Sequence, residues 1–246
     1  MILEATSGNT GIGLAFVAAA KGYAITLVMP ETMTLERRSL LKAYGAELLL
    51  TPGPAGMKGA VEKAEELAKA DSKYFLARQF DNPANPAIHR RTTALEILEQ
   101  VPELDAFVGG IGTGGTVTGV GEILAAKKPG TLVVAVEPES SPLLTKGTAG
   151  PNKIQGIGAN FIPSILNRQA YQRVEDVSYD DAVEVARQLT RKEGLFSGIS
   201  TGAIVFAAIK VAVELGKGKT VVAVLCDTGE RYLSHPLYSE IDGPSI

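Results

Sequence analysis

The sequence predicts an α/β fold built from parallel sheets, and three observations lead to this prediction. Short apolar runs rich in β-branched residues alternate along the chain with longer segments of helical spacing. Several strand segments are apolar at every position, as is typical of strands buried on both faces. Polar, glycine-rich loops follow three of the predicted strands, at the edge of the sheet where α/β proteins bind their ligands.

Residues 1–82 alternate between strands and helices. The apolar spacing predicts strands over 2–3, 24–29, 48–50 and 74–77 and helices over 12–20, 34–44 and 56–70. Gly45 follows one of these helices at the position where glycine commonly ends a helix. A chain that alternates in this way forms parallel βαβ units.

Residues 83–246 continue the alternation with longer elements. Helices are predicted over 87–99, 117–127, 179–193 and 201–215, and strands over 106–109, 132–136 and 220–225. Ser178 or Asp180 is expected to cap the helix that starts at residue 179, and Gly194 to end it. Residues 138–170 are rich in Gly, Pro and Asn, and an irregular segment of this length inside a compact domain is usually functional.

Composition and charge argue against several classes of function. The net charge is −3 and no cluster of Lys and Arg stands out, so nucleic acid is not expected as a partner. The one cysteine, Cys226, excludes internal disulfides and is predicted to be an inert core residue. With two histidines a His-rich metal centre is not expected, and no apolar run is long enough to span a membrane. We therefore predict a cytoplasmic protein without a metal.

The first glycine-rich loop follows residues 2–3 and opens helix 12–20. It contains an unbroken run of small polar residues and glycines, namely Thr6, Ser7, Gly8, Asn9, Thr10 and Gly11. Glycines let a ligand approach the backbone, and the free N–H groups of a helix start attract an anion. The loop therefore predicts a site for a carboxylate or a phosphate, and an ordinary helix cap is the alternative.

The second loop follows strand 106–109 and opens helix 117–127. Its residues are Gly112, Thr113, Gly114, Gly115 and Thr116. Successive backbone N–H groups here form an anion nest at a helix start, and phosphate is its natural ligand. Gly110, Gly112 and Gly115 also match the G-x-G-x-x-G pattern, with Glu137 where a ribose-binding acid belongs, so a nicotinamide dinucleotide is an alternative.

Other polar residues allow more than one interpretation. Ser200 lies in a G-x-S-x-G pattern, and Asp227 and His235 follow in the order of a hydrolase triad, but no adequate strand precedes the serine. Ser200 is more simply a helix cap or a ligand-binding hydroxyl. Asp227 and Glu230 form either an acidic pair or an ion pair with Arg231. His89, beside two arginines, is expected on a solvated face.

Taken together, the motifs resemble one family. They are Thr6–Gly11, Met29–Met33, Glu36–Arg38, Gln79–Phe80, Asn82–Pro86, Gly112–Thr116, Lys153–Ala159, Gly198–Ser200 and Gly229–Ser234. In this order they resemble the cysteine synthases, the O-acetylserine sulfhydrylases among the fold type II enzymes that use pyridoxal 5′-phosphate. The resemblance covers essentially all 246 residues and implies two αβα domains with parallel or mixed sheets, similar to the tryptophan synthase β subunit.

The resemblance implies a role for each matching residue. Thr6, Ser7, Gly8, Thr10 and Gln79 would bind the substrate carboxylate, and Asn9 would contact the 3′-oxygen of the cofactor. Residues 112–116 would hold the cofactor phosphate, Ser200 would bond to the pyridine nitrogen, and Gly156 would lie near the substrate amine. A neutral serine there leaves the ring a moderate electron sink, which suits β-elimination better than transamination.

The implied reaction is a β-replacement that makes L-cysteine. Acetate leaves O-acetyl-L-serine and sulfide takes its place. Cystathionine β-synthase and a homologue that uses O-phosphoserine are close alternatives. The family also implies a homodimer and a partner, the C-terminal peptide of serine acetyltransferase, so a regulatory binding protein without normal catalysis is a further hypothesis.

One departure from the family concerns the lysine that forms the Schiff base with the cofactor. In the family this lysine lies upstream of the loop 6–11, in an N-P-x-x-S-x-K-x-R segment that this sequence does not contain. No catalytic lysine is therefore assigned, and the chain is expected to be N-terminally truncated. Residues 1–82 would form an incomplete, smaller and mobile domain with the substrate loop, and residues 83–246 the larger domain that binds the cofactor phosphate.

Overall fold

The computed structural model describes residues 1–6 and 8–239, and these residues divide into two compact units. Unit 1 comprises residues 1–79 together with the chain from Asp227 onward, and unit 2 comprises residues 80–226. The sequence prediction placed the boundary after residue 82 and assigned all later residues to the second domain. In the structure the boundary lies at residue 79, and the segment that follows the last strand of unit 2 packs with unit 1.

Unit 1 contains a four-stranded parallel sheet with strand order β3-β2-β1-β4. The strands are β1 (Ile2–Ala5), β2 (Ile25–Pro30), β3 (Glu47–Thr51) and β4 (Phe75–Leu76), and the helices are α1 (Asn9–Lys21), α2 (Leu35–Ala43), α3 (Gly56–Ala70) and the short α10 (Pro236–Ser239). Two 3₁₀ turns, Gly53–Ala55 and Gly229–Tyr232, complete the unit. Every strand and helix predicted within residues 1–82 is present.

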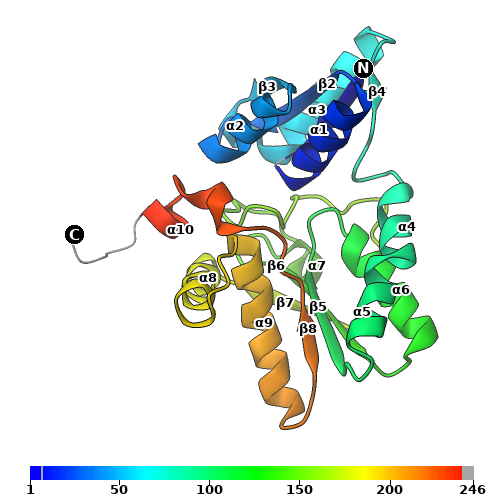
Figure 1. The fold of residues 1–246 in the computed structure, drawn as a ribbon, viewed down its shortest axis with the longest axis vertical. Coiled ribbons are helices and arrows are strands. Elements are labelled where there is room, and N and C mark those ends of the chain that lie inside the picture. The colour runs from blue at the N-terminus through cyan, green and yellow to red at the C-terminus, as the bar shows by residue number, and fades with distance from the viewer. Residues whose placement is uncertain (7, 240–246) are drawn as a thin grey trace. The chain divides into compact units, whose positions relative to one another are not determined.

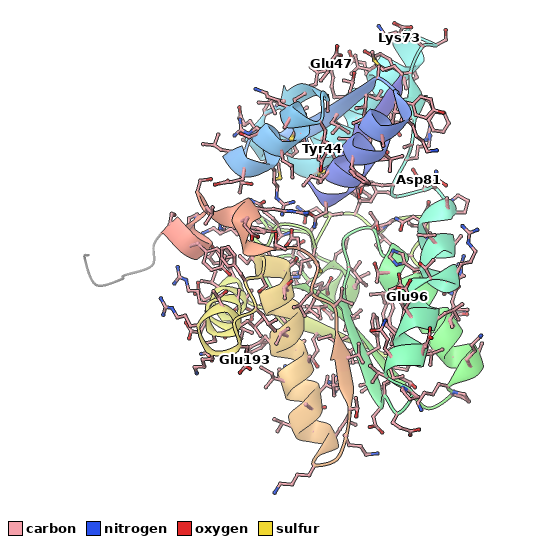
Figure 2. The ribbon with its side chains drawn as sticks, viewed as in Figure 1. Tyr44, Glu47, Lys73, Asp81, Glu96 and Glu193 are labelled. Atoms are coloured by element: carbon pink, nitrogen blue, oxygen red, sulfur yellow. The ribbon has the colours of Figure 1, made fainter. Side chains whose placement is uncertain are left out.

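The sheet of unit 1 is covered on both faces, which explains why β2 is buried at all six positions. Ile12 of α1 and Leu41 of α2 pack with Leu27 on one face. Ala60 of α3 packs with Val28 on the other face. Figure 2 labels Tyr44, which follows α2, and the ring of Phe16 on α1 meets it edge-on at 6.0 Å between centroids.

Unit 2 contains the second four-stranded parallel sheet, with strand order β7-β6-β5-β8. Its strands are β5 (Ala106–Gly110), β6 (Leu132–Pro138), β7 (Arg173–Val177) and β8 (Val221–Ala223), and its helices are α4 (Ala84–Arg91), α5 (Thr93–Gln100), α6 (Gly115–Lys127), α7 (Leu143–Lys146), α8 (Tyr179–Glu193) and α9 (Ile199–Leu215). Figure 1 shows α4, α5 and α6 on one face of this sheet and α8 and α9 on the other. The predicted α/β class with parallel sheets is confirmed.

Two features of unit 2 differ from the sequence prediction. The single helix predicted over 87–99 is two helices, because Thr92 leaves the helical conformation and its hydroxyl donates to the carbonyl of Ile88 at 2.8 Å. Strand β7 was not predicted, because its charged residues hide the alternation of an edge strand. Its Arg173 and Glu175 form ion pairs with Glu214 and Lys210 of α9.

The ends of helix α8 match the prediction. The Ser178 hydroxyl accepts a hydrogen bond from the backbone N–H of Asp181 at 3.0 Å, and Gly194 ends the helix in the left-handed conformation. No helix within the described residues is long and apolar enough to cross a membrane.

Candidate active site

The loop after β1 is held by hydrogen bonds to the side chain of its first residue, Thr6. Thr6 is 1% exposed, and its hydroxyl oxygen accepts hydrogen bonds from the N–H groups of Gly8 and Gly11, both at 3.1 Å. A hydroxyl oxygen accepts two hydrogen bonds, so only the hydroxyl proton of Thr6 is left for a ligand. Thr6 thus holds the first turn of α1 from outside the helix, whose N-cap residue is Gly8. Ser7 lies outside the described residues.

Behind this loop lies a buried arginine that the sequence did not single out as functional. Arg37, on α2, is 2% exposed and donates to the Asn9 carboxamide oxygen at 2.9 Å and to the Asp227 carboxylate at 2.8 Å. The Asn9 amide nitrogen donates to the same carboxylate oxygen at 3.0 Å. A Cβ atom on Gly8, whose φ is +154°, would lie 2.1 Å from the Arg37 guanidinium, so this close approach requires glycine.

Tyr232 and Arg231 complete the group of side chains around Arg37, Asn9 and Asp227. The Tyr232 hydroxyl donates to Asp227 at 2.9 Å and accepts from Arg37, whose guanidinium carbon lies 4.9 Å from the centre of the tyrosine ring. Arg231 donates to the Asn9 oxygen. Asp227 therefore forms its ion pair with Arg37 and not with Arg231 four residues further on, and this pairing leaves it unsuited to the triad of a hydrolase.

Gln79 lies beside Ala5, the residue that precedes the loop of residues 6–11. Its side chain donates to the carbonyl of Ala5, and its backbone N–H lies 3.3 Å from both carboxylate oxygens of Glu4. Glu4 is 2% exposed, and burial raises the pKa of its carboxyl to about 7, although backbone N–H groups act in the opposite direction. The structure thus places Gln79 next to the start of the loop and adds Glu4 to this region.

In unit 2, residues 111–114 join β5 to α6, and Gly115 and Thr116 begin α6. The Thr113 hydroxyl oxygen accepts from Asn85 at 3.0 Å and from the N–H of Gly115 at 3.2 Å. Gly114 adopts the left-handed conformation with φ +81°, and a Cβ on Gly115 would lie 1.9 Å from the Asn85 side chain. The segment is therefore a glycine turn at a helix start, and it is held by Asn85, a residue of the Asn82–Pro86 motif to which the sequence assigned no role.

Gly112, Gly156 and Ser200 lie together beside this loop. A Cβ on Gly112 would lie 2.3 Å from the carbonyl oxygen of Gly156, and a Cβ on Gly156 would lie 3.4 Å from the Ser200 hydroxyl. Ser200 is 1% exposed at the start of α9, and its hydroxyl makes no hydrogen bond within residues 1–6 and 8–239. A buried hydroxyl of this kind is ready for a ligand that carries a hydrogen-bonding atom.

Thr116, the last residue of the loop, contacts His89. The two imidazole nitrogens lie 2.9 Å from the Thr93 hydroxyl and 3.2 Å from the Thr116 hydroxyl. Burial lowers the pKa of His89, so the ring favours its neutral form. The expectation of a solvated face for His89 is therefore wrong, because the turn between α4 and α5 brings this side chain against α6.

The carboxylate that a dinucleotide site would need is already engaged. Glu137 is 3% exposed and accepts hydrogen bonds from the backbone N–H groups of Leu144 and Thr145 at 2.8 and 2.9 Å. It therefore holds the start of α7 and does not face a ribose. Cys226 is exposed three residues after β8, so the prediction that it lies in the core is wrong.

The residues present fit a phosphorylated aromatic cofactor. Glycine N–H groups, two threonine hydroxyls and the positive end of α6 suit a phosphate. The unengaged Ser200 hydroxyl at the start of α9 suits a ring nitrogen. An α/β fold with glycine-rich turns at the starts of two helices is typical of an enzyme that binds a phosphorylated cofactor.

Comparison with known proteins identifies the family. Residues 1–227 match the family described as pyridoxal-phosphate dependent enzymes, and the chain belongs to this family and depends on pyridoxal phosphate. Cysteine synthases from strains of Staphylococcus aureus are 57% identical over 240 residues, which are 97% of this chain and 77% of each relative.

Solved structures agree with this assignment. The crystal structure of O-ureido-L-serine synthase superposes with a TM-score of 0.94 at 47% identity, over 99% of this chain and 78% of the other. A cysteine synthase from Entamoeba histolytica gives 0.90 at 44% identity over 99% of this chain and 73% of its own. An O-acetylserine-dependent cystathionine β-synthase from Helicobacter pylori gives 0.92 at 39%, over 96% and 78%.

Proposed function

We propose that the protein makes L-cysteine from O-acetyl-L-serine and sulfide, with pyridoxal phosphate as cofactor. The observation that carries this proposal is the 57% identity with cysteine synthase over 97% of the chain. The family match over residues 1–227 and the two loops described above are consistent with it.

In this proposal unit 2 binds the cofactor. Residues 112–116 hold its phosphate, with Thr113 and Thr116 kept in place by Asn85 and His89. Ser200 bonds to the pyridine nitrogen. When bound, pyridoxal phosphate supplies a sink for the electrons that are released at the α-carbon of the substrate. A serine hydroxyl supports a neutral pyridine, which favours elimination and replacement at the β-carbon.

Unit 1 contributes the substrate loop. Thr6, Ser7, Gly8 and Thr10 bind the substrate carboxylate together with Gln79, whose side chain lies against Ala5. Asn9 contacts the 3′-oxygen of the cofactor, and Gly156 of unit 2 contacts the substrate amine. These residues act by orientation, because a carboxylate fixed at several points leaves the reacting carbon few alternative positions.

The partners that the family resemblance implies belong to the same proposal. We expect a homodimer in the cytoplasm and binding of the C-terminal peptide of serine acetyltransferase at the loop of residues 6–10. Size-exclusion chromatography with light scattering tests the dimer. Titration with a synthetic peptide of that C-terminus tests the second partner, and O-acetyl-L-serine should compete with the peptide.

The activity test uses the purified chain with pyridoxal phosphate, O-acetyl-L-serine and sulfide, and measures L-cysteine. Formation of cysteine that falls strongly in the Ser200→Ala variant is the expected result. Replacing sulfide by homocysteine tests the cystathionine alternative, and replacing the acetyl ester by O-phosphoserine tests the other substrate. Cofactor binding without any replacement activity would overturn the proposed reaction and favour a regulatory binding protein.

Reduction with borohydride gives a second test, because a lysine amine is the group that joins pyridoxal phosphate covalently. The loops 6–11, 112–116 and 154–158 contain no lysine. Peptide mass spectrometry after reduction would identify any modified lysine. An adduct on one lysine supports catalysis by this chain, whereas its absence limits the chain to non-covalent binding of the cofactor.

A further inference from the structure

The Arg37–Asp227 pair has no role in the reaction described above, yet it is built into the loop that carries Asn9. Both side chains are almost fully buried, at 2% and 0% exposure, and they meet at 2.8 Å. The two residues are 190 positions apart in the sequence. Burying two opposite charges is costly unless their geometry is good and their other hydrogen-bonding atoms are satisfied.

The other atoms of the pair are not fully satisfied. The Nε atom of Arg37 and the Oδ1 atom of Asp227 are buried and have no hydrogen-bond partner among the described residues. A pair that served stability alone would be expected to use these atoms, and native structures leave few buried polar groups unsatisfied. The other polar atoms of the pair form hydrogen bonds with Asn9 and Tyr232.

The cluster fixes which way round the Asn9 carboxamide lies. Its oxygen accepts from two guanidinium groups, those of Arg37 and Arg231, and its nitrogen donates to the Asp227 carboxylate. A carboxamide turned by 180° would place its N–H₂ group against the guanidinium groups and its oxygen against the carboxylate. Both contacts would be repulsive, so one orientation is strongly preferred.

Arginine is the residue that this arrangement needs. One nitrogen of Arg37 bonds to Asn9 while the other bonds to Asp227 and Tyr232, so the planar guanidinium spans two partners at once. A lysine ammonium is a single point charge and does not offer this fork. The same guanidinium packs against Gly8, where a side chain would collide with it.

We propose that Arg37 and Asp227 are positioning residues, which hold the Asn9 carboxamide in one orientation for the ligand of the loop. The expected effect of this orientation on cofactor binding rests on the proposed function. The orientation of the Asn9 carboxamide does not. Arg37 and Asp227 touch neither substrate nor cofactor in this proposal. They act through Asn9, and Tyr232 holds the pair in place.

The orientation is tested by nuclear magnetic resonance of the side-chain amide of Asn9 in the full chain, assigned by its loss in Asn9→Ala. The wild type should give a pair of resonances shifted by the carboxylate and protected from hydrogen exchange. Arg37→Lys should move them to the positions of a freely rotating amide. Arg38→Lys is the matched control, because Arg38 lies next on α2 and donates instead to the carbonyls of Met33 and Glu31. Unchanged Asn9 resonances in folded Arg37→Lys would overturn the proposal.

Should Arg37→Lys fail to fold, Tyr232→Phe provides the milder variant. It removes one hydroxyl that accepts from Arg37 and donates to Asp227. The Asn9 resonances should then shift part of the way and exchange faster. A Tyr232→Phe chain with wild-type Asn9 resonances and exchange would contradict the positioning role.

The consequence for the cofactor is tested by titrating pyridoxal phosphate into four chains: the wild type, Asn9→Ala, Arg37→Lys and the double variant. Each single variant should weaken binding roughly tenfold, the change expected for losing one hydrogen bond to a charged or well-oriented group. The double variant should be no weaker than Asn9→Ala alone. Additive losses would show that Arg37 acts apart from Asn9 and would overturn the proposal. A wild type without cofactor affinity would instead refute the proposed function, while the resonances of Asn9 still decide the orientation.

Discussion

The two glycine-rich loops, which we propose to bind the substrate carboxylate and the cofactor phosphate, are held in place by different interactions. The loop after β1 is held by charged side chains, chiefly Arg37 and Asp227, which close on Asn9 from behind. The loop after β5 depends on the absence of side chains at Gly112 and Gly115. This absence lets the carbonyl of Gly156 and the side chain of Asn85 pack against the backbone of the loop. The first loop therefore depends on charge and the second on space, and different changes should damage each.

The largest effect is expected where the charge is removed. Asp227→Ala leaves the Arg37 guanidinium buried without its counter-ion, and breaking a buried pair in this way typically costs about 3–5 kcal/mol. Urea denaturation gives the change in the free energy of unfolding. Glu230→Ala is the control, because Glu230 is an exposed acid in the same segment. A loss for Asp227→Ala as small as that of the control would contradict the view that charge holds this loop.

The loop of unit 1 should also respond to pH, through Glu4 directly before it. Burial raises the pKa of Glu4 from 4.5 to about 7, so the folded protein binds a proton that the unfolded chain releases between these values. This contribution to stability is complete below about pH 4.5 and is lost as the pH rises through about 7. It amounts to at most about 3 kcal/mol.

Comparing the wild type with Glu4→Gln isolates this contribution. The variant cannot ionise, so its unfolding free energy should fall less between pH 5 and pH 8 than that of the wild type. Denaturation curves at several pH values measure the difference. Parallel pH profiles for the two proteins would show that Glu4 titrates normally and would refute the prediction.

The loop of unit 2 should be sensitive to added volume instead. In Gly112→Ala the new Cβ would lie 2.3 Å from the backbone oxygen of Gly156, and forcing an atom into a packed site typically costs about 1–3 kcal/mol. Affinity for pyridoxal phosphate should fall as well. Gly13→Ala is the matched control, because a Cβ at this helical position of α1 would meet nothing within 4 Å. Equal effects of the two substitutions on stability and affinity would contradict the claim that the loop of unit 2 depends on the lack of a side chain at Gly112.

The smallest effect on stability is expected at Ser200. Its hydroxyl makes no hydrogen bond among the described residues, so Ser200→Ala should change the free energy of unfolding by less than about 0.5 kcal/mol. Cofactor binding should nonetheless weaken, and the absorption spectrum of the bound cofactor should change. A marked loss of stability together with unchanged cofactor affinity would mean that Ser200 serves packing.

The contrast between the loops also explains what the sequence could reveal. The turn at residues 112–116 could be predicted from the sequence, because the glycines that allow its conformation and its close packing are visible between a strand and a helix. The helices and strands around it follow from the spacing of apolar residues. The split at Thr92 was missed, because a hydroxyl that bonds to its own helix leaves the apolar spacing unchanged.

The side chains behind the first loop were hidden for a different reason. Arg37 lies among charged residues that indicate a solvated helix face, and its partner Asp227 is 190 residues away. Nothing in the local pattern distinguishes a buried arginine from an exposed one. The sequence could not reveal that Glu4 is buried and His89 half-buried, because each depends on which distant segments pack against it.

The discontinuous make-up of unit 1 has a consequence for how the protein is made. Asp227 belongs to the same unit as Arg37 but follows it by 190 residues, so it is synthesised after all of unit 2. At roughly 5–20 residues per second, this interval is about 10–40 s. During that time the growing chain carries Arg37 without its counter-ion, while the whole of unit 2 is synthesised. A growing chain therefore cannot complete the Arg37–Asp227 pair, or the hydrogen bond from Asn9 to Asp227, before Asp227 has been synthesised.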